Sequence, residues 1–355
     1  MSATPAGKKP RVSVLIPACN AGRYIDASLG SALRQSEPDL EVIAVINGSS
    51  DDTEDRLRRC ADPRLRIIAQ PAGGLAAALN TAILAARADH IAFLDADDVW
   101  LPEKLARHLE AHERYPEIDA TFSWVRVIDA YGCILRMPCP QWRGRTNFSS
   151  LLSDYTIRTM SAVMMKRTSA LEAGLLDPAL TRCVDIDFLL RVALLRPDNI
   201  LAVPRVLNLY RRHSAQRTSE WCRIREGWDE LLEKMRGLAP AETGSVERLA
   251  SSNMYRYFAF LAYMGSDFRQ ATQLAARSVA LSPGRVFLDA RNWKMGAAVL
   301  ASRIMPRGAL AALEYCAGFQ RSGNQPAPEH SWPRNDSRVK SHTELNRAAW
   351  AQKIR

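Results

Sequence analysis

Short apolar runs alternate with helical patterns through the first hundred residues, and this alternation restricts the possible fold more than any other feature of the sequence. The apolar runs are bounded by turn or charged residues, so they predict buried strands over 12–16, 41–46, 64–69 and 91–94. Apolar residues at helical spacing between these runs predict helices over 24–35, 51–60 and 75–87. An alternating order of this kind is typical of an α/β fold with a doubly wound, mostly parallel sheet.

Three polar turns directly follow strands of this sheet, over residues 17–20, 47–50 and 95–98. In open parallel sheets, ligands bind beyond the carboxyl ends of the strands. We therefore expect the three turns to meet at one edge of the sheet and to form a binding site there.

The turn after the fourth strand holds three carboxylates, Asp95, Asp97 and Asp98. Carboxylates this close together repel and raise one another's pKa unless a cation lies between them. A divalent metal ion with a diphosphate on its far side would supply that cation. The alternative is an acidic turn in which Asp98 caps the helix that starts near Pro102.

The pattern changes after residue 215. Before residue 215 we expect further strands over 121–127 and 161–165 and a helix over 180–195. After it the pattern predicts only helices, over 221–235, 247–264, 268–280 and 290–305. The helices around Gly265 resemble one tetratricopeptide hairpin, which is too few units for a solenoid. We interpret this region as a helical appendage, with a protein-binding surface as the alternative.

These patterns divide the chain into four parts. We expect an α/β domain over residues 11–215 and an all-helical C-terminal region over residues 216–318. Residues 1–10 have no apolar run, and residues 319–355 are basic and poor in apolar side chains, so both ends are expected to be disordered.

The composition narrows the class of partner without choosing one. A chain of 355 residues with 47% hydrophobic content can bury a large core. Its net charge of +10 favours an anionic partner, such as a nucleotide sugar, a lipid headgroup or nucleic acid. Because the aromatic residues are not interleaved with the basic ones as on a single-strand binding surface, we expect no nucleic acid partner.

Cysteine usage and hydropathy suggest a location. The seven cysteines are scattered and form no CxxC pair, which favours free thiols in a reducing compartment over disulfides or a zinc site. No apolar run reaches the roughly 18 residues of a membrane-spanning helix, and no apolar segment typical of a signal peptide follows the N-terminus. We therefore expect a cytoplasmic protein, either free or at the inner face of the membrane.

Four motifs occur in the order and at the distances of a known enzyme family. They are Val14-Leu-Ile-Pro-Ala-Cys-Asn20, Asn47-Gly-Ser-Ser-Asp51, Gly74 followed by Ala78-Leu-Asn80, and Asp95-Ala-Asp-Asp-Val-Trp100. Together they resemble the nucleotide-binding half of a family 2 glycosyltransferase with the GT-A fold. The resemblance implies an inverting, metal-dependent enzyme that moves a sugar from a nucleotide-sugar donor to a hydroxyl acceptor in the synthesis of a surface polysaccharide or lipopolysaccharide.

The resemblance also implies how the nucleobase is bound. Pro17, Ala18 and Cys19 would pack against the base, and Asn47 would meet its polar edge. The family usually has two aspartates where this chain has Ile46 and Asn47, and an amide can donate as well as accept hydrogen bonds. A UDP-sugar is the expected donor, with dTDP or GDP sugars as alternatives. A turn-forming asparagine before glycine is the structural alternative for Asn47.

Further roles follow from the same resemblance. Gly74 and Asn80 match the loop and helix that flank the donor, although Leu79 stands where the family often has arginine. Asp95 would bind the ribose, and Asp97 would bind Mg²⁺ or Mn²⁺, which neutralises charge on the departing diphosphate.

A second acidic residue would act as the base. Asp185 matches the usual base of the family, whereas Val184 stands where a glutamate is common. Asp185 would remove the proton of the acceptor hydroxyl, and the alternative is a carboxylate that suits a helix N-terminus. Arg211 and His213 lie in the segment that closes the domain and would contact the diphosphate or the metal, with a solvated basic loop as the alternative.

Two alternatives concern the molecule as a whole. The departures at Asn47, Leu79 and Val184 leave open a catalytically weak nucleotide-sugar-binding pseudoenzyme whose helical C-terminus recruits partners. The helix over 290–305 has an apolar stripe bordered by basic residues, so it would lie on an anionic membrane or pack on the catalytic domain. Peripheral membrane contact would suit a glycan or lipid-linked glycan acceptor.

Overall fold

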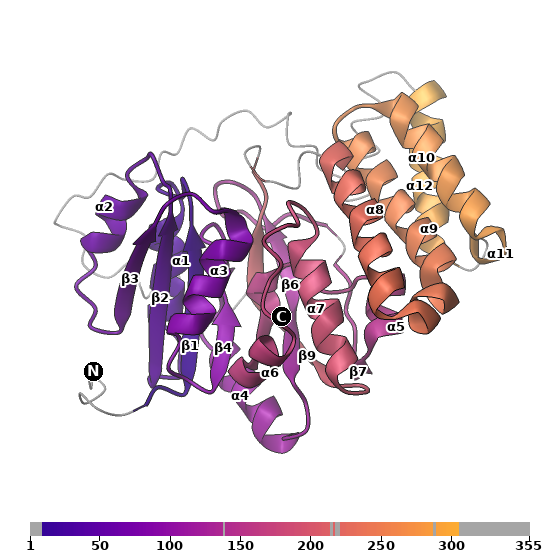
Figure 1. Ribbon diagram of the computed structural model, residues 1–355. Coiled ribbons are helices and arrows are strands. Elements are labelled where there is room, and N and C mark those ends of the chain that lie inside the picture. The colour runs from indigo at the N-terminus through magenta and orange to yellow at the C-terminus, as the bar shows by residue number, and fades with distance from the viewer. Residues whose placement is uncertain (1–8, 138, 214–215, 217–220, 287–288, 305–355) are drawn as a thin grey trace. The chain divides into compact units, whose positions relative to one another are not determined.

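The computed structural model describes residues 9–137, 139–213, 216, 221–286 and 289–304. Over these residues a nine-stranded sheet runs in the order β3-β2-β1-β4-β8-β6-β9-β5, with β7 beside β9 (Figure 1). The four strands predicted in the first hundred residues are present and parallel to one another; they are β1 (Val12–Ala18), β2 (Leu40–Asn47), β3 (Leu65–Gln70) and β4 (His90–Phe93). The predicted α/β fold with a mostly parallel central sheet is therefore confirmed.

Helices cover both faces of these strands. The connecting helices are α1 (Ile25–Leu33), α2 (Thr53–Arg58) and α3 (Gly74–Ala85). Because side chains alternate along β1, Val14 and Ile16 join the core beneath α1, whereas Leu15 joins the core beneath α3. The sheet is thus buried on both faces, as expected of a doubly wound fold.

The second half of the sheet contains antiparallel strands. Its strands are β5 (Val99–Trp100), β6 (Ala120–Ile128), β7 (Arg145–Thr146), β8 (Val163–Lys166) and β9 (Ile200–Arg211). Its helices are α4 (Lys104–Arg114), α5 (Phe148–Ser153), α6 (Arg167–Glu172) and α7 (Val184–Leu195), with a 3-10 turn over Met160–Ala162. Strand β8 runs antiparallel between β4 and β6, while β6 and β9 are parallel.

The longest strand of the sheet, β9, is absent from the sequence prediction. Proline has no N–H to donate to a ladder, so Pro204 argues against a strand in this segment. In the structure the pairing of β6 with β9 passes from Ser123–Val203 to Trp124–Val206, so Pro204 lies in a bulge that interrupts the ladder. The bulge lets the strand continue to Arg211 at the site edge.

The C-terminal helices pack on the α/β domain through α8 and α9. They are α8 (Trp221–Leu238), α9 (Pro240–Met264), α10 (Phe268–Leu281), α11 (Pro283–Val286) and α12 (Ala290–Ile304). Helices α8 and α9 lie beside α5 and α7 in Figure 1, and α10 and α12 pack on α9. Trp228 and Phe258 are buried in the same core cluster as Phe188 of α7. Nδ2 of Asn253 donates to the Ser153 carbonyl at the end of α5 over 2.7 Å.

Two further expectations concern the chain as a whole. Among the helices described, none is long and apolar enough to cross a bilayer. The six cysteines that the structure describes are all free thiols. The domain boundaries stay predictions, and the ends expected to be disordered fall largely in residues 1–8 and 305–355, outside the described residues.

Candidate active site

The three polar turns meet at one edge of the sheet, as the order of strands requires. Oδ1 of Asn20, after β1, accepts a hydrogen bond of 2.8 Å from the Ser50 N–H, after β2. Oγ of Ser28 in α1 donates to the carbonyl of Asp95, after β4, over 3.1 Å. These contacts join the turns after β1 and β2, and join α1 to the turn after β4; that the three turns form one binding site stays a prediction.

The acidic turn is held from the far side by Thr159. Its hydroxyl donates to Asp95 Oδ2 at 2.9 Å and lies 3.3 Å from Asp98 Oδ2. The N–H of Asp95 donates to Ser161 Oγ over 2.9 Å, and Asp98 Oδ1 accepts the Arg211 N–H over 2.9 Å. Asp98 is fully buried and does not cap α4, so the capping alternative is wrong and Asp98 instead ties the turn to the end of β9.

Two carboxylates of this turn have raised pKa values. Burial, and then the nearby charge of Asp97, raise the pKa of Asp95 to about 6. Burial raises the pKa of Asp98 well above its usual range, and the charges of Asp97 and Asp95 add to the shift. A cation beside Asp97 would relieve this repulsion, which is the behaviour expected of a metal-binding carboxylate cluster.

His213 faces this turn from the end of β9. Its Nε2 lies 3.0 Å from Asp97 Oδ2, and its ring stacks at 4.9 Å from the ring of Tyr24. The Asp97 side chain is 26% exposed and the His213 side chain 15%, so both are reachable from solvent. The structure thus brings together the two residues predicted to bind the metal.

The donor set fits Mg²⁺ or Mn²⁺. Over the described residues, no group of three or more His, Cys, Asp or Glu side chains is placed to hold a metal ion. Asp97 and His213 would therefore provide two protein ligands, with water and diphosphate oxygens completing the shell. Mg²⁺ is commonly bound through one or two carboxylates and substrate phosphates, which is the part that Asp97 would play.

Arg211 is placed beside the same turn but is engaged by backbone groups. Its Nε donates to the Asp97 carbonyl over 2.7 Å, and its Nη1 donates to the Asp129 carbonyl over 3.2 Å. The guanidinium also lies over the Tyr24 ring at 4.8 Å. Burial lowers its pKa. These contacts show a positioning role, and the predicted contact with the diphosphate stays a prediction.

Asp185 occupies the first turn of α7. Its negative charge contributes to the raised pKa of Asp95, so the two carboxylates lie within electrostatic range. The residue before α7, Cys183, is held at φ +54°, in the left-handed region that side chains other than glycine rarely adopt. Backbone strain of this kind often marks a functional site, here two residues before the expected base.

The residues predicted to bind the nucleobase differ in accessibility. Cys19 is exposed and Pro17 half-buried, whereas the Ala18 side chain is buried in the core and can offer a ligand only its backbone. Asn47 is 6% exposed, and its amide bonds the turn at α3: Nδ2 donates to the Gly74 carbonyl and Oδ1 accepts the Gly73 N–H.

Asn80 has a similar connecting role. Its Nδ2 donates to the Leu176 carbonyl over 2.8 Å, and its Oδ1 accepts the Leu176 N–H over 2.9 Å. The side chain therefore ties α3 to the segment that leads to Asp185. Direct donor contacts by Asn47, Gly74 and Asn80 stay predictions.

Thr159 and Tyr24 are the site residues that sequence reasoning missed. Thr159 bonds carboxylates 61 and 64 residues away, and Tyr24 contacts Arg211 and His213 through its ring. Neither belongs to a motif, so only the folded arrangement reveals them.

Comparison with known proteins agrees with this geometry. Residues 13–170 match the family model "Glycosyl transferase family 2". Among curated relatives, the Escherichia coli enzyme named UDP-Glc:alpha-D-GlcNAc-diphosphoundecaprenol beta-1,3-glucosyltransferase WfgD is 27% identical over 62% of this chain and 85% of its own. Other matches are shorter. A Nostoc glycosyltransferase is 37% identical over 29% of this chain and 33% of its own length. A Pasteurella multocida chondroitin synthase is 33% identical over 36% of this chain and 13% of its own length.

Solved structures share the fold. Staphylococcus aureus TarS (residues 1–349) in complex with UDP-GlcNAc aligns with a TM-score of 0.56 and 16% identity over 87% of this chain and 90% of its own. The Pyrobaculum calidifontis mannosyltransferase PcManGT, in complex with GDP-Man and Mn²⁺, aligns with a TM-score of 0.53 and 20% identity over 84% and 87%. Residues 13–170 therefore form a family 2 glycosyltransferase domain, and the chain has the GT-A fold.

Proposed function

We propose that this chain transfers a sugar from a nucleotide-sugar donor to a hydroxyl of a glycan acceptor, in polysaccharide synthesis and with inversion at the anomeric carbon. The observation that carries the proposal is that two other carboxylates act on the Asp95 carboxylate at one edge of the sheet. Besides burial, the charges of Asp97 and Asp185, which come from different elements, both raise the pKa of Asp95. The arrangement gives one acidic group for a metal and another for a proton.

The proposed donor is a UDP-sugar, with dTDP and GDP sugars as alternatives. TarS was solved with UDP-GlcNAc and PcManGT with GDP-Man, which supports a nucleotide-sugar donor for the shared fold. In the proposed complex Cys19 and Pro17 lie against the base, and the Asp95 carboxylate accepts hydrogen bonds from the ribose. The hydrogen bond from Thr159 fixes that carboxylate in one orientation.

Asp97 and His213 would hold the metal. When bound there, Mg²⁺ or Mn²⁺ supplies positive charge that stabilises the departing nucleoside diphosphate. The chain's own contribution is orientation: Arg211 fixes the backbone of Asp97, and the Tyr24 ring supports the imidazole of His213.

Asp185 would act as general base. Its carboxylate takes the proton of the acceptor hydroxyl as that oxygen attacks the anomeric carbon and the bond to the diphosphate breaks. A single displacement of this kind, without an enzyme nucleophile, inverts the configuration.

A lipid-linked glycan is the proposed acceptor class, because the WfgD relative is named for a diphosphoundecaprenol acceptor. Helix α12 supports membrane contact: Trp293, Leu300 and Ile304 are 56%, 61% and 71% exposed and recur at helical spacing. Lys294 is exposed beside them. An apolar stripe with neighbouring basic residues binds anionic bilayer surfaces, so we propose a location at the inner face of the membrane.

The alternative is a nucleotide-sugar-binding pseudoenzyme. It is favoured by Val184, which is buried where the family often has a glutamate, and by the structural use of the Asn47 amide.

A panel of UDP, dTDP and GDP sugars, each with and without Mn²⁺, tests the donor part of the proposal. A ligand that binds only the folded state at about 100 times its Kd adds about 2.7 kcal/mol of stability. We expect metal-dependent thermal stabilisation by at least one donor. If no donor stabilises the protein, the proposal fails.

A further inference from the structure

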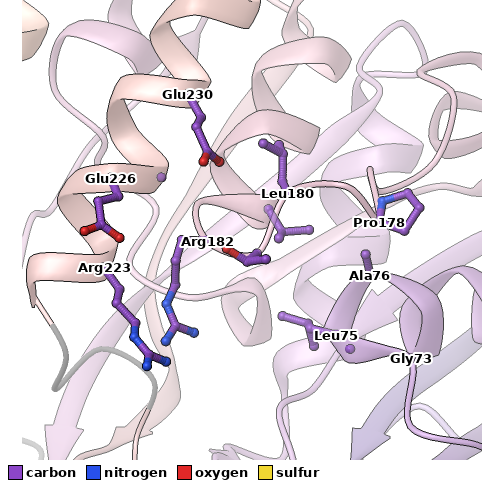
Figure 2. A pocket seen from close by; sticks show the side chains of 13 residues that line it. Gly73, Leu75, Ala76, Pro178, Leu180, Arg182, Arg223, Glu226 and Glu230 are labelled. Carbon is purple, nitrogen blue, oxygen red and sulfur yellow. The ribbon is translucent and has the colours of Figure 1, made fainter.

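A cleft of about 500 Å³ opens beside the proposed base. One wall is the turn at the start of α3, from Gly73 to Ala76, and a second is the segment from Pro178 to Val184 (Figure 2). The third wall is α8, which lies outside the part of the chain that matches the family model. Val184, which lines the cleft, directly precedes Asp185, the proposed base.

Helix α8 is held against the α/β domain by two ion pairs of one lysine. Nζ of Lys234 lies 2.8 Å from Asp187 in α7 and 2.7 Å from Asp177, before the cleft segment. The Asp187 side chain is fully buried and also pairs with Arg191. These ion pairs therefore hold α8 in place as one wall of the cleft.

A close backbone approach fixes α8 at the cleft itself. A Cβ atom built on Gly227 would lie 2.4 Å from Cβ of Arg182. Glycine thus permits α8 to lie directly on the segment that carries Arg182, and this contact determines where the Arg182 side chain leaves the backbone.

Two arginines from different walls extend to the same side of the cleft. Figure 2 shows the guanidinium groups of Arg182 and Arg223 pointing the same way, with the carboxylates of Glu226 and Glu230 on the following turns of α8. A planar guanidinium donates two parallel hydrogen bonds to a phosphate or carboxylate, and an anion between two of them is stabilised by both. The glutamates offer acceptors suited to sugar hydroxyls.

We infer that this cleft binds the acceptor and that Arg182 and Arg223 hold an anionic group on it. The inference rests on the proposed function and specifies its acceptor. The donor nucleotide is proposed for the edge formed by β1, β2 and β4. Gly74, which is predicted to flank the donor, lies in one wall of the cleft, and Val184, next to the proposed base, lies in another, so the donor and the molecule whose hydroxyl attacks would meet here. The anionic group is a phosphate of a lipid carrier or the carboxylate of an acidic sugar unit.

Isothermal titration of the full chain, with UDP and Mg²⁺ present to occupy the donor site, distinguishes these sources. The probes are GlcNAc-diphosphate carrying a short alkyl chain, the same alkyl GlcNAc without phosphate, and a disaccharide ending in glucuronate. We expect one anionic probe to bind at least about tenfold more tightly than the neutral one, since it gains charge-assisted hydrogen bonds. Binding of the diphosphate probe identifies a lipid carrier, and binding of the glucuronate probe identifies an acidic glycan.

Variants of the arginines assign the effect to the cleft. Arg182→Gln and Arg223→Gln should each lose about tenfold in affinity for that anionic probe. Arg225→Gln is the matched control, because it removes the same charge from α8 without lining the cleft, and it should bind like the unmodified chain. Circular dichroism and the melting temperature check that each variant is folded.

Three results overturn the inference: no anionic probe binds more tightly than the neutral one, the arginine variants behave like Arg225→Gln, or the neutral probe loses as much affinity as the anionic one. The proposed function is judged separately by nucleoside diphosphate release from the unmodified chain. If the unmodified chain releases nucleoside diphosphate and the arginine variants bind the anionic probe as well as it does, only the acceptor-site inference is rejected.

Discussion

His213 Nε2 and Asp97 Oδ2 lie 3.0 Å apart although 116 positions separate them in the chain. The contact joins the segment that follows β9 to the turn after β4, and β8 and β6 lie between these two strands in the sheet. It shows that β9, through its last residues, completes the site that the first four strands begin.

The metal site predicts the effect of removing either ligand. Asp97→Ala and His213→Ala should abolish the Mn²⁺-dependent part of donor stabilisation in a thermal denaturation series, since a site with two protein ligands cannot lose one without losing most of its affinity. Asp55→Ala, an exposed carboxylate on α2, is the control and should retain the full shift. A normal Mn²⁺ effect in Asp97→Ala would show that the metal is bound elsewhere.

Thr159 should stabilise the acidic turn. Thr159→Val keeps the shape of the buried side chain but leaves Asp95 and Asp98 without the hydroxyl, so we expect the free energy of unfolding to fall by about 1–3 kcal/mol. Urea denaturation measures the change. Thr159→Ser keeps a hydroxyl at this position and should lose much less; equal losses in both variants would show that packing, and not the hydrogen bonds, stabilises the turn.

Two glycines of α8 give a paired test of helix position. Gly227→Ala should destabilise the chain and lower turnover, because its new methyl group would overlap Cβ of Arg182. Gly237→Ala meets no atom within 4 Å and should be neutral or stabilising by up to about 1 kcal/mol, as alanine is the better helix former. Similar effects of the two substitutions on melting temperature and turnover would contradict the close approach of α8 to Arg182.

Buried histidines on α4 should make stability depend on pH. Burial lowers the pKa of His108 well below its usual range and that of His112 to about 3. The unfolded chain then takes up protons below pH 6.5 that the folded chain does not, so the stability these groups contribute is present above pH 6.5 and is lost as pH falls.

His112→Gln isolates one of these groups. The raised pKa of Asp95 makes stability change with pH in the opposite direction, because its contribution is lost as pH rises from 3.8 through about 6. The effect of Asp95 is present in both proteins. It therefore cancels in the difference between the unfolding free energies of the variant and the unmodified chain. We expect this difference in unfolding free energy to change by about 1.4 kcal/mol per pH unit below pH 6.5, measured by urea denaturation. A pH-independent difference would mean that His112 is charged in the folded state.

Local patterns were sufficient to predict the first half of the fold. Strands β1 to β4 are continuous apolar runs with turns at both ends, so their existence and the positions of Asp95 and Asp97 at their ends follow from local sequence. Strand β9 was missed because the bulge at Pro204 depends on its pairing with β6, and the two-residue strand β5 has too few residues to form a pattern.

The site could be predicted only where a motif carries it. Thr159 has no motif, and its partners are distant in the chain. The hydrogen bonds that Asn47, Asn80 and Arg211 make to backbone groups depend on loops brought close by folding. A resemblance between motifs names such residues but does not distinguish a ligand contact from a contact that positions a neighbouring loop.

The Asp185→Asn variant gives the most direct test of the central claim. With the nucleotide sugar and Mn²⁺ that stabilise the unmodified chain, and with an acceptor that this chain glycosylates, nucleoside diphosphate release and product formation are measured for both proteins. The account predicts that the variant binds the donor normally, seen as an unaltered thermal shift, but forms no product, because the amide cannot take the acceptor proton. Product formation by Asp185→Asn at the rate of the unmodified chain would contradict it.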